Sequence, residues 1–510
     1  MRLNGEVTSD LFPLLRDDLA SAAFSVDALG TLWGPDAAAA LHRGQRLPAL
    51  RALARIAGGG PLGTLATLFV LGLPVSRDRV NGALPRLGAA GAEQLGLVGF
   101  DADEAHPLLD LRPYAFVDAR GAGSWWIASD LGEVALGGAI PEHHVLGVGG
   151  ASTTLSSLMI STPVESALDL GTGCGIQALH AARHARRVVA TDISERALEL
   201  AAFNARLNGV ENIEFRHGSL FEPVAGELFD HIVSNPPFVI TPRQEGVPAY
   251  EYRDGGLIGD ALVEQVVRES ARHLTPGGVA QLLGNWEYRG DEDGLERVEG
   301  WLEGVALDAW VIERERQDAA LYAETWIRDG GTRPGSSDFD RLYAAWLDDF
   351  EARGVTGVGF GYLTLRAPLG SAPTLRRFER LDGALGRNEA GLGQHIAASL
   401  AALDAQGALT DAELAATRLV VAGDVTEERY YWPGDEDPTV MDLRQGGGFG
   451  RSRPLGTALA AVVGASDGEL SVGAICAAIA ELLGVDGDEL LADVLPEIRE
   501  LISTGFVAIA

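Results

Sequence analysis

The chain has 510 residues, of which 72 are acidic and 40 basic, so its formal net charge is -32 at pH 7. Its length and its 46% of hydrophobic residues predict two or three domains with buried cores. So acidic a protein is not expected to attach broadly to nucleic-acid phosphates or anionic membranes. Cys174 and Cys476 are too few for a disulfide scaffold or a zinc site, which favours a cytoplasmic protein and predicts no metal.

The first part of the chain, residues 1–138, is predicted to be mainly helical. Apolar residues recur there at helical spacing, and short strands follow. The predicted helices are Leu11–Ala23, Pro35–His42, Leu47–Ile56, Leu62–Leu71 and Ser76–Leu87, and the predicted strands are Leu95–Phe100, Leu108–Asp118 and Ser124–Ser129. This order is that of a winged-helix-like domain, and its few basic residues favour protein docking over DNA binding. The apolar stretch Pro61–Val75 is too short for a membrane span, so no membrane partner is expected.

A connecting segment, residues 139–154, leads into the next domain. His143 and His144 are of a residue type that binds metals, but no third ligand lies at metal spacing, so they are interpreted as structural. The run Gly147–Thr154 contributes hydroxyl groups that are candidates for secondary ligand contacts.

A glycine-rich turn follows the next predicted strand. The short apolar run Ser166–Leu170 contains Asp169, and Gly171, Gly173 and Gly175 come after it at alternate positions. Glycines at such a turn let the backbone approach a ligand, and the N–H groups of the following helix face it. Turns of this kind also serve nicotinamide and flavin cofactors, so this pattern alone leaves the cofactor open.

An acidic residue ends the second predicted strand. Arg187–Thr191 is followed by Asp192, at the distance from the glycines where a carboxylate can accept the hydroxyl groups of a ribose. Ser194 then caps a helix. The alternative is that Asp192 is only an acidic residue of a helix N-terminus.

The third strand ends in Asn235-Pro236-Pro237-Phe238. Two prolines fix an extended backbone, so the Asn235 amide and the adjacent carbonyl are held at the carboxyl edge of the sheet, where ligands bind in open α/β folds. Two acceptors can grip an NH2 group while an aromatic ring stacks on the planar system that carries it. Such a site orients a planar amino nitrogen and shares the positive charge that develops as a methyl group arrives. A plain rigid turn is the alternative.

With these three motifs, the segment from about Leu146 to Arg366 resembles a class I S-adenosyl-L-methionine-dependent methyltransferase of the small-domain (MTS) superfamily. The resemblance implies a Rossmann-like, seven-stranded α/β sheet over residues 139–367. It also implies S-adenosyl-L-methionine as cofactor. The cofactor-binding residues that it implies are Asp169, Gly171, Gly173 and Gly175 at the methionine end, Asp192 at the ribose, Ser219 and Leu220 at the adenine, and also Thr172, Ile193 and Asn235.

The same resemblance implies that Asn235, Pro236, Pro237 and Phe238 are the catalytic residues that hold the target amino group. The superfamily includes protein-glutamine N5-methyltransferases and RNA or DNA amino-group methyltransferases. Its glutamine-modifying members usually end the motif in tyrosine, whereas Phe238 keeps the ring and lacks the hydroxyl group, so the substrate stays open.

The rest of the catalytic domain alternates strands and helices around one insertion. Beside the transfer site, the loop Thr241–Gly256 carries Arg243, Glu245, Tyr250, Glu251, Tyr252, Arg253 and Asp254. These residues suggest substrate contacts or a lid. We predict strands at Val279–Leu283, Ala306–Glu313 and Val358–Leu365, and a helical insertion over residues 315–356.

The last part, residues 368–510, is predicted to be a second winged-helix-like accessory domain. We expect helices over Leu375–Leu403 and Thr410–Ala416, a strand over Arg418–Val425, and further helices before a final strand at Phe506–Ile509.

These patterns predict an N-methyltransferase that acts on a planar amino or amide nitrogen of a macromolecule, most simply a protein glutamine. Two accessory domains suit a large substrate, and the acidic charge favours protein over RNA. A ribosomal or transfer RNA amino-group methyltransferase and a natural-product or peptide methyltransferase are the alternatives. The sequence leaves the oligomeric state open.

Overall fold

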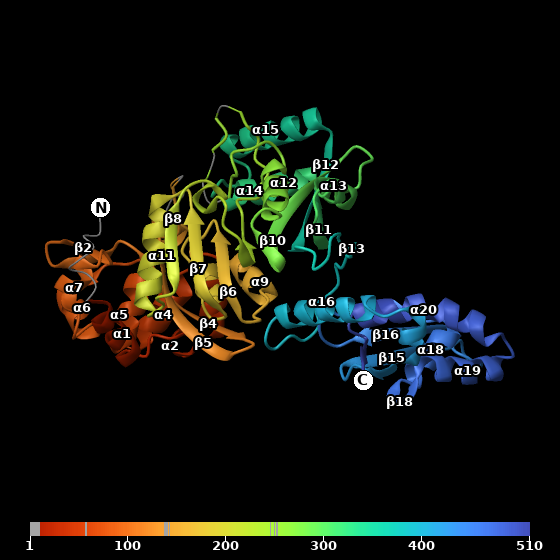
Figure 1. Cartoon of the computed structure of the whole chain (residues 1–510). Helices are drawn as coiled ribbons and strands as arrows, with labels where there is room; N and C mark the ends of the chain where they lie inside the picture. The colour runs from red at the N-terminus through yellow and green to blue at the C-terminus, as the bar shows by residue number, and fades with distance from the viewer. Residues whose placement is uncertain are drawn as a thin grey trace. The chain divides into compact units, whose positions relative to one another are not determined.

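The computed structural model describes residues 11–56, 59–136, 141, 143–244, 246–248, 250 and 253–510. Glu245, Glu251 and Tyr252 of the predicted substrate loop lie outside them, as does the expected domain junction at residue 138. The chain forms two compact units (Figure 1). The first unit comprises Met1–Val117, Ala122–Ser156 and Pro163–Arg380, and the second comprises Asp118–Gly121, Ser157–Thr162 and Leu381–Ala510.

An eight-stranded mixed sheet, in the order β13-β11-β12-β10-β9-β6-β7-β8, forms the centre of the first unit. Its strands are β6 (Val164–Leu170), β7 (Ala185–Asp192), β8 (Ile213–His217), β9 (Phe229–Ser234), β10 (Leu274–Arg289), β11 (Asp308–Asp318), β12 (Val355–Arg366) and β13 (Arg376–Arg380). Strand β12 runs antiparallel to β10 and β11, and the other neighbours are parallel. The predicted α/β fold is confirmed.

Two strand predictions need correction. The sheet has eight strands rather than seven, because Arg376–Arg380 pairs in parallel with β11 along the edge. This segment falls within Leu375–Leu403, which was predicted to be helical, and the helix there begins only at Gly393. Its sequence, RRFER, is charged enough to sit at an exposed edge, where charged side chains discourage further pairing.

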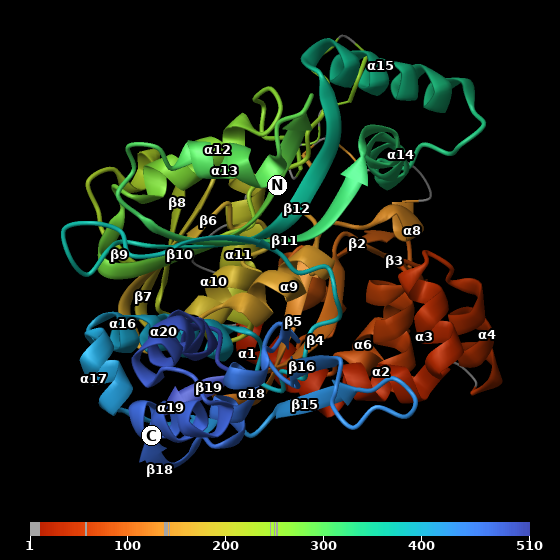
Figure 2. The same cartoon turned by 90° about the vertical axis from the view of Figure 1, so that its right-hand side faces the viewer.

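Helices cover both faces of the sheet. Figure 2 shows α12 and α13 on one face and α9, α10 and α11 on the other. The bounds are α9 (Gly150–Leu158), α10 (Ile176–Ala181), α11 (Glu195–Leu207), α12 (Ala261–Ser270) and α13 (Gly294–Trp301), with a short 3-10 turn, η2, at Glu222–Val224. Ser194 caps α11 as predicted, accepting a hydrogen bond from the Ala197 N–H. The predicted insertion forms two helices, α14 (Ala319–Asp329) and α15 (Ser337–Arg353).

The N-terminal part of the first unit is helical with two small sheets, of order β1-β3-β2 and β4-β5. Its helices are α1 (Leu11–Ser21), α2 (Val26–Trp33), α3 (Pro35–His42), α4 (Leu47–Arg55), α5 (Gly60–Leu65), the π-helical η1 (Ala66–Val70), α6 (Arg77–Ala83), α7 (Gly88–Gln94) and α8 (Glu133–Leu136). Its strands are β1 (Val75–Ser76), β2 (Val98–Asp101), β3 (Glu104–Pro107), β4 (Asp110–Asp118) and β5 (Gly121–Ser129). The predicted helix Ser76–Leu87 is thus α6 alone, since α7 starts after it. Within the described residues, no helix is long and apolar enough to cross a membrane.

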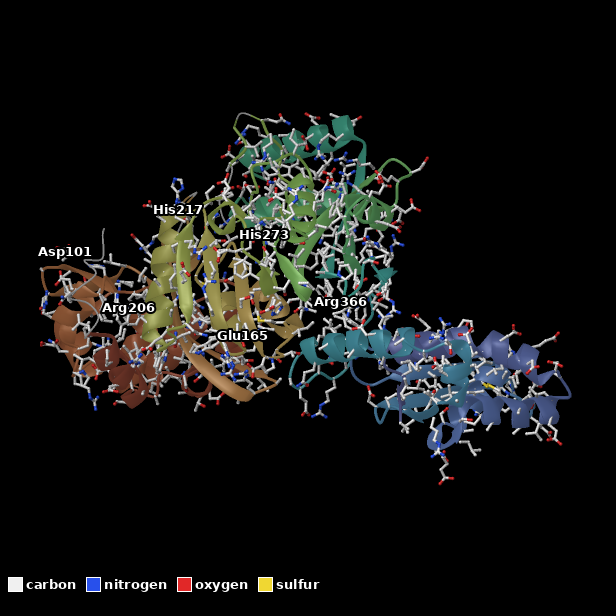
Figure 3. All side chains as sticks on the ribbon, in the orientation of Figure 1. Asp101, Glu165, Arg206, His217, His273 and Arg366 are labelled. Carbon is white, nitrogen blue, oxygen red and sulfur yellow. The ribbon has the colours of Figure 1, made fainter. Side chains whose placement is uncertain are left out.

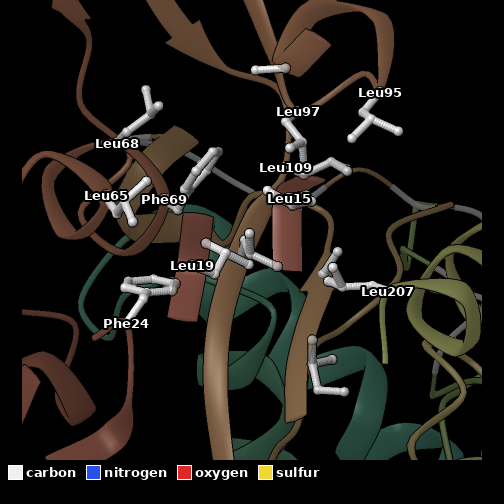
Figure 4. Packing of buried hydrophobic residues seen from close by; sticks show 14 of the residues in the cluster. Leu15, Leu19, Phe24, Leu65, Leu68, Phe69, Leu95, Leu97, Leu109 and Leu207 are labelled. Carbon is white, nitrogen blue, oxygen red and sulfur yellow. The ribbon is translucent and has the colours of Figure 1, made fainter. Parts of the chain in front are cut away.

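One hydrophobic cluster joins this N-terminal part to α10 and α11. The buried residues of this cluster include Leu15 and Leu19 of α1, Leu207 of α11, and Leu109, which precedes β4 (Figure 4). Asn204 of α11 and Asn208, which follows the last residue of this helix, extend the contact with hydrogen bonds to strand β5. Asn204 accepts a hydrogen bond from the backbone N–H of Ala128 and donates one to the Ala128 carbonyl. Asn208 makes the same two bonds with the backbone of Trp126.

The second unit contains two three-stranded sheets, of order β18-β14-β19 and β15-β16-β17. Its strands are β14 (Arg418–Val421), β15 (Val425–Tyr430), β16 (Val440–Gln445), β17 (Ser452–Pro454), β18 (Asp467–Ser471) and β19 (Val507–Ile509). Its helices are α16 (Gly393–Gly407), α17 (Asp411–Ala416), α18 (Thr457–Gly464), α19 (Val472–Leu483) and α20 (Gly487–Ser503). The winged-helix character of both flanking parts stays a prediction.

Replacing Asn204 should destabilise the first unit. Asn204 is fully buried, and its Nδ2 also donates to the carbonyl of Cys174 at 2.8 Å. We expect Asn204→Leu to lower the free energy of unfolding by about 2–4 kcal/mol, because several buried backbone groups lose their partner. Urea unfolding followed by tryptophan fluorescence measures this change. The exposed Glu195→Gln on the same helix is the control, and equal stability of both variants would contradict the expectation.

Candidate active site

The predicted glycine turn follows β6 and has the backbone that glycine favours. Gly171, Gly173 and Gly175 have φ angles of 76°, 54° and 86°. A Cβ atom added to Gly171 or Gly173 would meet nothing within 4 Å, so these two residues border open space. A Cβ at Gly175 would lie 3.0 Å from the Cα of Ala201 in α11. The first two glycines therefore shape a cradle, and the third allows close helix packing.

Asp169 lies beneath this turn with one carboxylate oxygen engaged. Its Oδ2 accepts hydrogen bonds from the Thr172 hydroxyl at 2.6 Å and from the Ala178 N–H at 2.8 Å, whereas its Oδ1 is buried without a hydrogen-bond partner. Burial raises the pKa of Asp169 to about 7. Burial also raises the pKa of the Cys174 thiol to about 11, so this thiol stays protonated at neutral pH.

Asp192 ends β7 and faces the same turn. Its Oδ2 accepts the Gly173 N–H and its Oδ1 accepts the Ser194 N–H, both at 2.9 Å. A carboxylate oxygen can accept more than one hydrogen bond. Ile193, the next residue, is 63% exposed, an unusual position for a large apolar side chain.

Ser219 and Leu220 come shortly after β8, the strand next to β7. Leu220 has a φ of 46°, a conformation that residues other than glycine seldom adopt and that is enriched at functional sites. His217 ends β8 and lies at the carboxyl edge of the sheet, whereas Glu165, near the start of β6, lies at the amino edge (Figure 3). The Asp192, Ile193 and Ser219-Leu220 segments thus come together at the carboxyl edge of the sheet.

The Asn235-Pro236-Pro237-Phe238 motif begins directly after β9. The Ser234 hydroxyl donates to the carbonyl of Leu170 at 2.8 Å, which ties the motif to the strand that enters the glycine turn. The Asn235 side-chain oxygen, Oδ1, is buried and has no hydrogen-bond partner. The half-buried ring of Phe238 lies 5.6 Å from the ring centroid of Phe360 and 6.4 Å from that of Trp326.

Four buried polar atoms around this edge lack a hydrogen-bond partner within the described protein. They are Asp169 Oδ1, Gln177 Oε1, Asn235 Oδ1 and one amide atom of Asn285. Asp169 lies near the end of β6, Gln177 in the first turn of α10, Asn235 directly after β9, and Asn285 near the end of β10. A bound ligand with N–H donors would satisfy the three acceptors of Asp169, Gln177 and Asn235, so this edge fits a cofactor or substrate that carries amino groups.

Sequence reasoning missed Gln177, Asn285, Tyr322 and Trp326. Gln177 could have been found from its place two residues after the third glycine, and its Nε2 donates to the Ser152 carbonyl in the predicted Gly147–Thr154 run at 2.7 Å. Asn285 had a weaker signal in the sequence: it is a polar residue shortly after the predicted strand 279–283. Tyr322 and Trp326, spaced i and i+4, resemble ordinary core residues. In the part of the chain that the structure describes, no three His, Cys, Asp or Glu side chains could hold a metal.

Comparison with known proteins agrees with this geometry. The family model described as "Methyltransferase small domain" matches residues 147–306. A putative protein N5-glutamine methyltransferase of Methanocaldococcus jannaschii is 35% identical over 135 residues, which cover 26% of this chain and 68% of that protein. The chain belongs to the methyltransferase small-domain family. This family uses S-adenosyl-L-methionine.

Other relatives of this methyltransferase match over shorter shares of their length. A ribosomal protein uL3 glutamine methyltransferase of Bradyrhizobium diazoefficiens is 34% identical over 32% of this chain and 54% of its own. A release factor glutamine methyltransferase of Aliivibrio fischeri is 47% identical over 15% of this chain and 28% of its own. The chain thus spans about half the length of the first of these two relatives.

Two further matches concern the flanking part and the fold. Residues 21–108 match a domain of unknown function (DUF7059). A solved ribosomal protein L11 methylase from Lactobacillus delbrueckii aligns with 46% of this methyltransferase and 82% of its own chain, at 21% identity and a TM-score of 0.26. So distant a likeness adds nothing to the observed sheet order.

The two kinds of glycine in the methyltransferase turn predict different defects. We expect Gly173→Ala to keep the fold and weaken S-adenosyl-L-methionine binding at least tenfold, because its methyl group enters the open cradle. Gly175→Ala should instead lower the thermal stability, because its methyl group meets the backbone of α11. Calorimetric titration and thermal unfolding of both variants measure this. Identical behaviour of the two variants would contradict the assignment.

Proposed function

We propose that this chain transfers the methyl group of S-adenosyl-L-methionine to the side-chain amide nitrogen of a protein glutamine. The single observation that carries the proposal is the buried, unpaired Asn235 Oδ1 at the carboxyl end of β9. An acceptor in this position fits a target NH2 group. The names of the relatives, glutamine methyltransferases for release factors and for ribosomal protein uL3, support glutamine as the target.

The cofactor would lie across the carboxyl ends of β6 and β7. The free lone pairs of Asp169 and Gln177 suit its ammonium group, and the open side of Gly171 and Gly173 suits the chain that follows. Thr172 acts through Asp169, to which its hydroxyl donates. The Asp192 carboxylate suits the two ribose hydroxyl groups, and Ile193 and the Ser219-Leu220 segment suit the adenine ring.

The target nitrogen would be held by Asn235 Oδ1 and the carbonyl of Pro236. Bound S-adenosyl-L-methionine supplies an electrophilic methyl group. The lone pair of an amide nitrogen is delocalised, so the acceptors orient its N–H groups and share the positive charge that develops on it. The Phe238 ring adds cation–π attraction for this charge. The nitrogen would gain the methyl group as the carbon–sulfur bond of the donor breaks, with S-adenosyl-L-homocysteine as the leaving group, and would then lose one proton to water.

The flanking parts, residues 1–138 and 368–510, are assigned to docking of a macromolecular protein substrate. The net charge of -32 favours a basic protein over a polyanion. The buried free thiols of Cys174 and Cys476 suit a cytoplasmic location.

A labelling experiment tests the substrate class. The protein is incubated with S-adenosyl-L-methionine carrying a radioactive methyl group and with purified release factor, ribosomal protein uL3, or total RNA. We expect label in protease-sensitive material and, after digestion, in N5-methylglutamine. Label confined to nuclease-sensitive material would instead indicate RNA amino-group methylation and contradict the proposal.

Removing the Asn235 amide should abolish transfer without affecting cofactor binding. We expect Asn235→Ala to lower kcat by roughly a hundredfold or more, because the acceptor for the target nitrogen is lost. Its affinity for S-adenosyl-L-methionine, measured by calorimetry, should change less than twofold. Phe238→Tyr is the matched control, because it keeps the ring and should retain activity. A fully active Asn235→Ala variant would refute the assigned role.

Cofactor affinity should depend on pH through Asp169. The pKa of this carboxyl is raised to about 7 by burial, and an ammonium group prefers the ionised form. We therefore expect affinity to rise about tenfold from pH 6 to pH 8, because below pH 7 binding must displace a proton. Asp169→Asn cannot ionise and should bind weakly with no such dependence. Calorimetric titration with S-adenosyl-L-methionine across this pH range measures the affinity of both proteins. The same pH dependence of affinity in wild type and Asp169→Asn would argue against a role for the Asp169 carboxylate.

A further inference from the structure

The side chain of Asn285 carries a polar group that the proposed reaction does not yet use. Asn285 is 1% exposed and lies near the carboxyl end of β10. One atom of its amide lies 2.7 Å from the hydroxyl oxygen of Tyr322 in α14. The other amide atom is buried without a partner. An unpaired buried polar atom is destabilising, so it needs an explanation.

The hydroxyl group of Tyr322 decides which amide atom faces it. This hydroxyl accepts a hydrogen bond from the Ile240 N–H at 3.1 Å. If the Asn285 nitrogen also donated to it, the hydroxyl proton would have no acceptor. With the Asn285 oxygen in that position, the hydroxyl donates its proton to this oxygen and still accepts the Ile240 N–H. A separation of 2.7 Å is typical of O–H···O bonds and short for N–H···O bonds.

It follows that the NH2 group of Asn285 occupies the unpaired position. Exchanging nitrogen and oxygen rotates the planar amide by 180° and moves no atom appreciably. Asn285 then offers a hydrogen-bond donor where Asn235 offers an acceptor.

The two amides leave neighbouring strands at the same edge of the sheet. Strand β10 runs parallel to β9, with Leu282 opposite Ser234, so Asn235 and Asn285 both lie beyond the last paired residues. The Tyr322 hydroxyl reaches Ile240, two residues after the motif ring of Phe238. Asn285 is also paired across the sheet with Phe360, whose ring is next to Phe238. Figure 2 shows α14 beside the strand pair β11 and β12.

We propose that Asn285 is a substrate-positioning residue whose NH2 group donates to the carbonyl oxygen of the carboxamide that Asn235 holds by its nitrogen. This inference rests on the proposed function. Tyr322 acts through Asn285, since it fixes the amide orientation. A donor for the oxygen and an acceptor for the nitrogen are complementary to a carboxamide, and a glutamate carboxylate would leave the Asn235 acceptor without a donor.

Asn285→Asp separates this role from simple support of Tyr322. An aspartate can accept the Tyr322 proton in either protonation state, but it can donate to substrate only when protonated. We measure kcat/KM on release factor or uL3 for the variant and for wild type. We expect the ratio of the variant's kcat/KM to that of wild type to fall at least tenfold as the pH rises from 6 to 9. Affinity for S-adenosyl-L-methionine and the thermal stability at each pH should stay within the range of wild type.

The groups around Asn285 do not provide this pH dependence themselves. Burial raises the pKa of Tyr322 above its usual value, so its hydroxyl stays protonated over the range of the assay. Arg253 and Glu287 are the charged groups that act on this hydroxyl, with opposite effects on its pKa. The wild-type profile is therefore the reference at every pH.

A ratio to wild type that stays near one at every pH would overturn the inference. So would a constant loss that Tyr322→Phe reproduces, because both would then reflect support of the motif segment. If Asn285→Asp does not fold, Asn285→Ala and Tyr322→Phe are compared instead. We expect the larger loss of kcat/KM in Asn285→Ala, and equal losses in the two variants would overturn the inference. Absence of transfer by the wild-type protein to any protein would refute the proposed function itself. Transfer by wild type with an unaffected Asn285→Asp would refute only this inference.

Discussion

Acceptor atoms that are buried without donors are the constraint on which the active-site edge depends. Asp169, Asn235 and Gln177 are each held in place by the sheet or by α10, yet each keeps an oxygen that no group among the described residues satisfies. The free energy lost there is recovered only when a donor arrives from outside the chain. The carboxyl ends of the parallel strands collect these atoms on one edge, so a ligand with several amino hydrogens can satisfy them together.

The antiparallel strand β12 explains how a distant helix reaches this edge. Strand β11 is parallel to β10, because both run antiparallel to β12, and the chain therefore leaves β11 at the edge that carries the Asn-Pro-Pro-Phe motif. The insertion that forms α14 and α15 begins at this point and returns through β12. Tyr322 can thus bond to Ile240 although 82 residues separate them in sequence. A change in the insertion would alter the surroundings of the motif without altering the motif.

Local motifs made the place of the candidate cofactor residues in the fold predictable, and their roles stay a proposal. The glycine turn, Asp192 and the Asn-Pro-Pro-Phe motif each consist of neighbouring residues at the end of one apolar strand, and each lies where the parallel sheet was expected to place it. The family match supports the reading of these motifs. Asn285 was not predictable in this way, since its role depends on a tyrosine that only the folded insertion brings near. Strand β13 was missed because its charged sequence forms a strand only through pairing with β11.

The contact between β5 and α11 limits how this chain can be shortened. Asn204 bonds at once to strand β5 and to the carbonyl of Cys174 inside the glycine turn, and the residues around it share one hydrophobic cluster with α1. A shortened protein that kept only the matched segment 147–306 would leave the outer faces of α10 and α11 uncovered, with Leu179, Phe203 and Leu207 in contact with water. Such a fragment would tend to self-associate, and Asn204 would lose its two hydrogen bonds to β5.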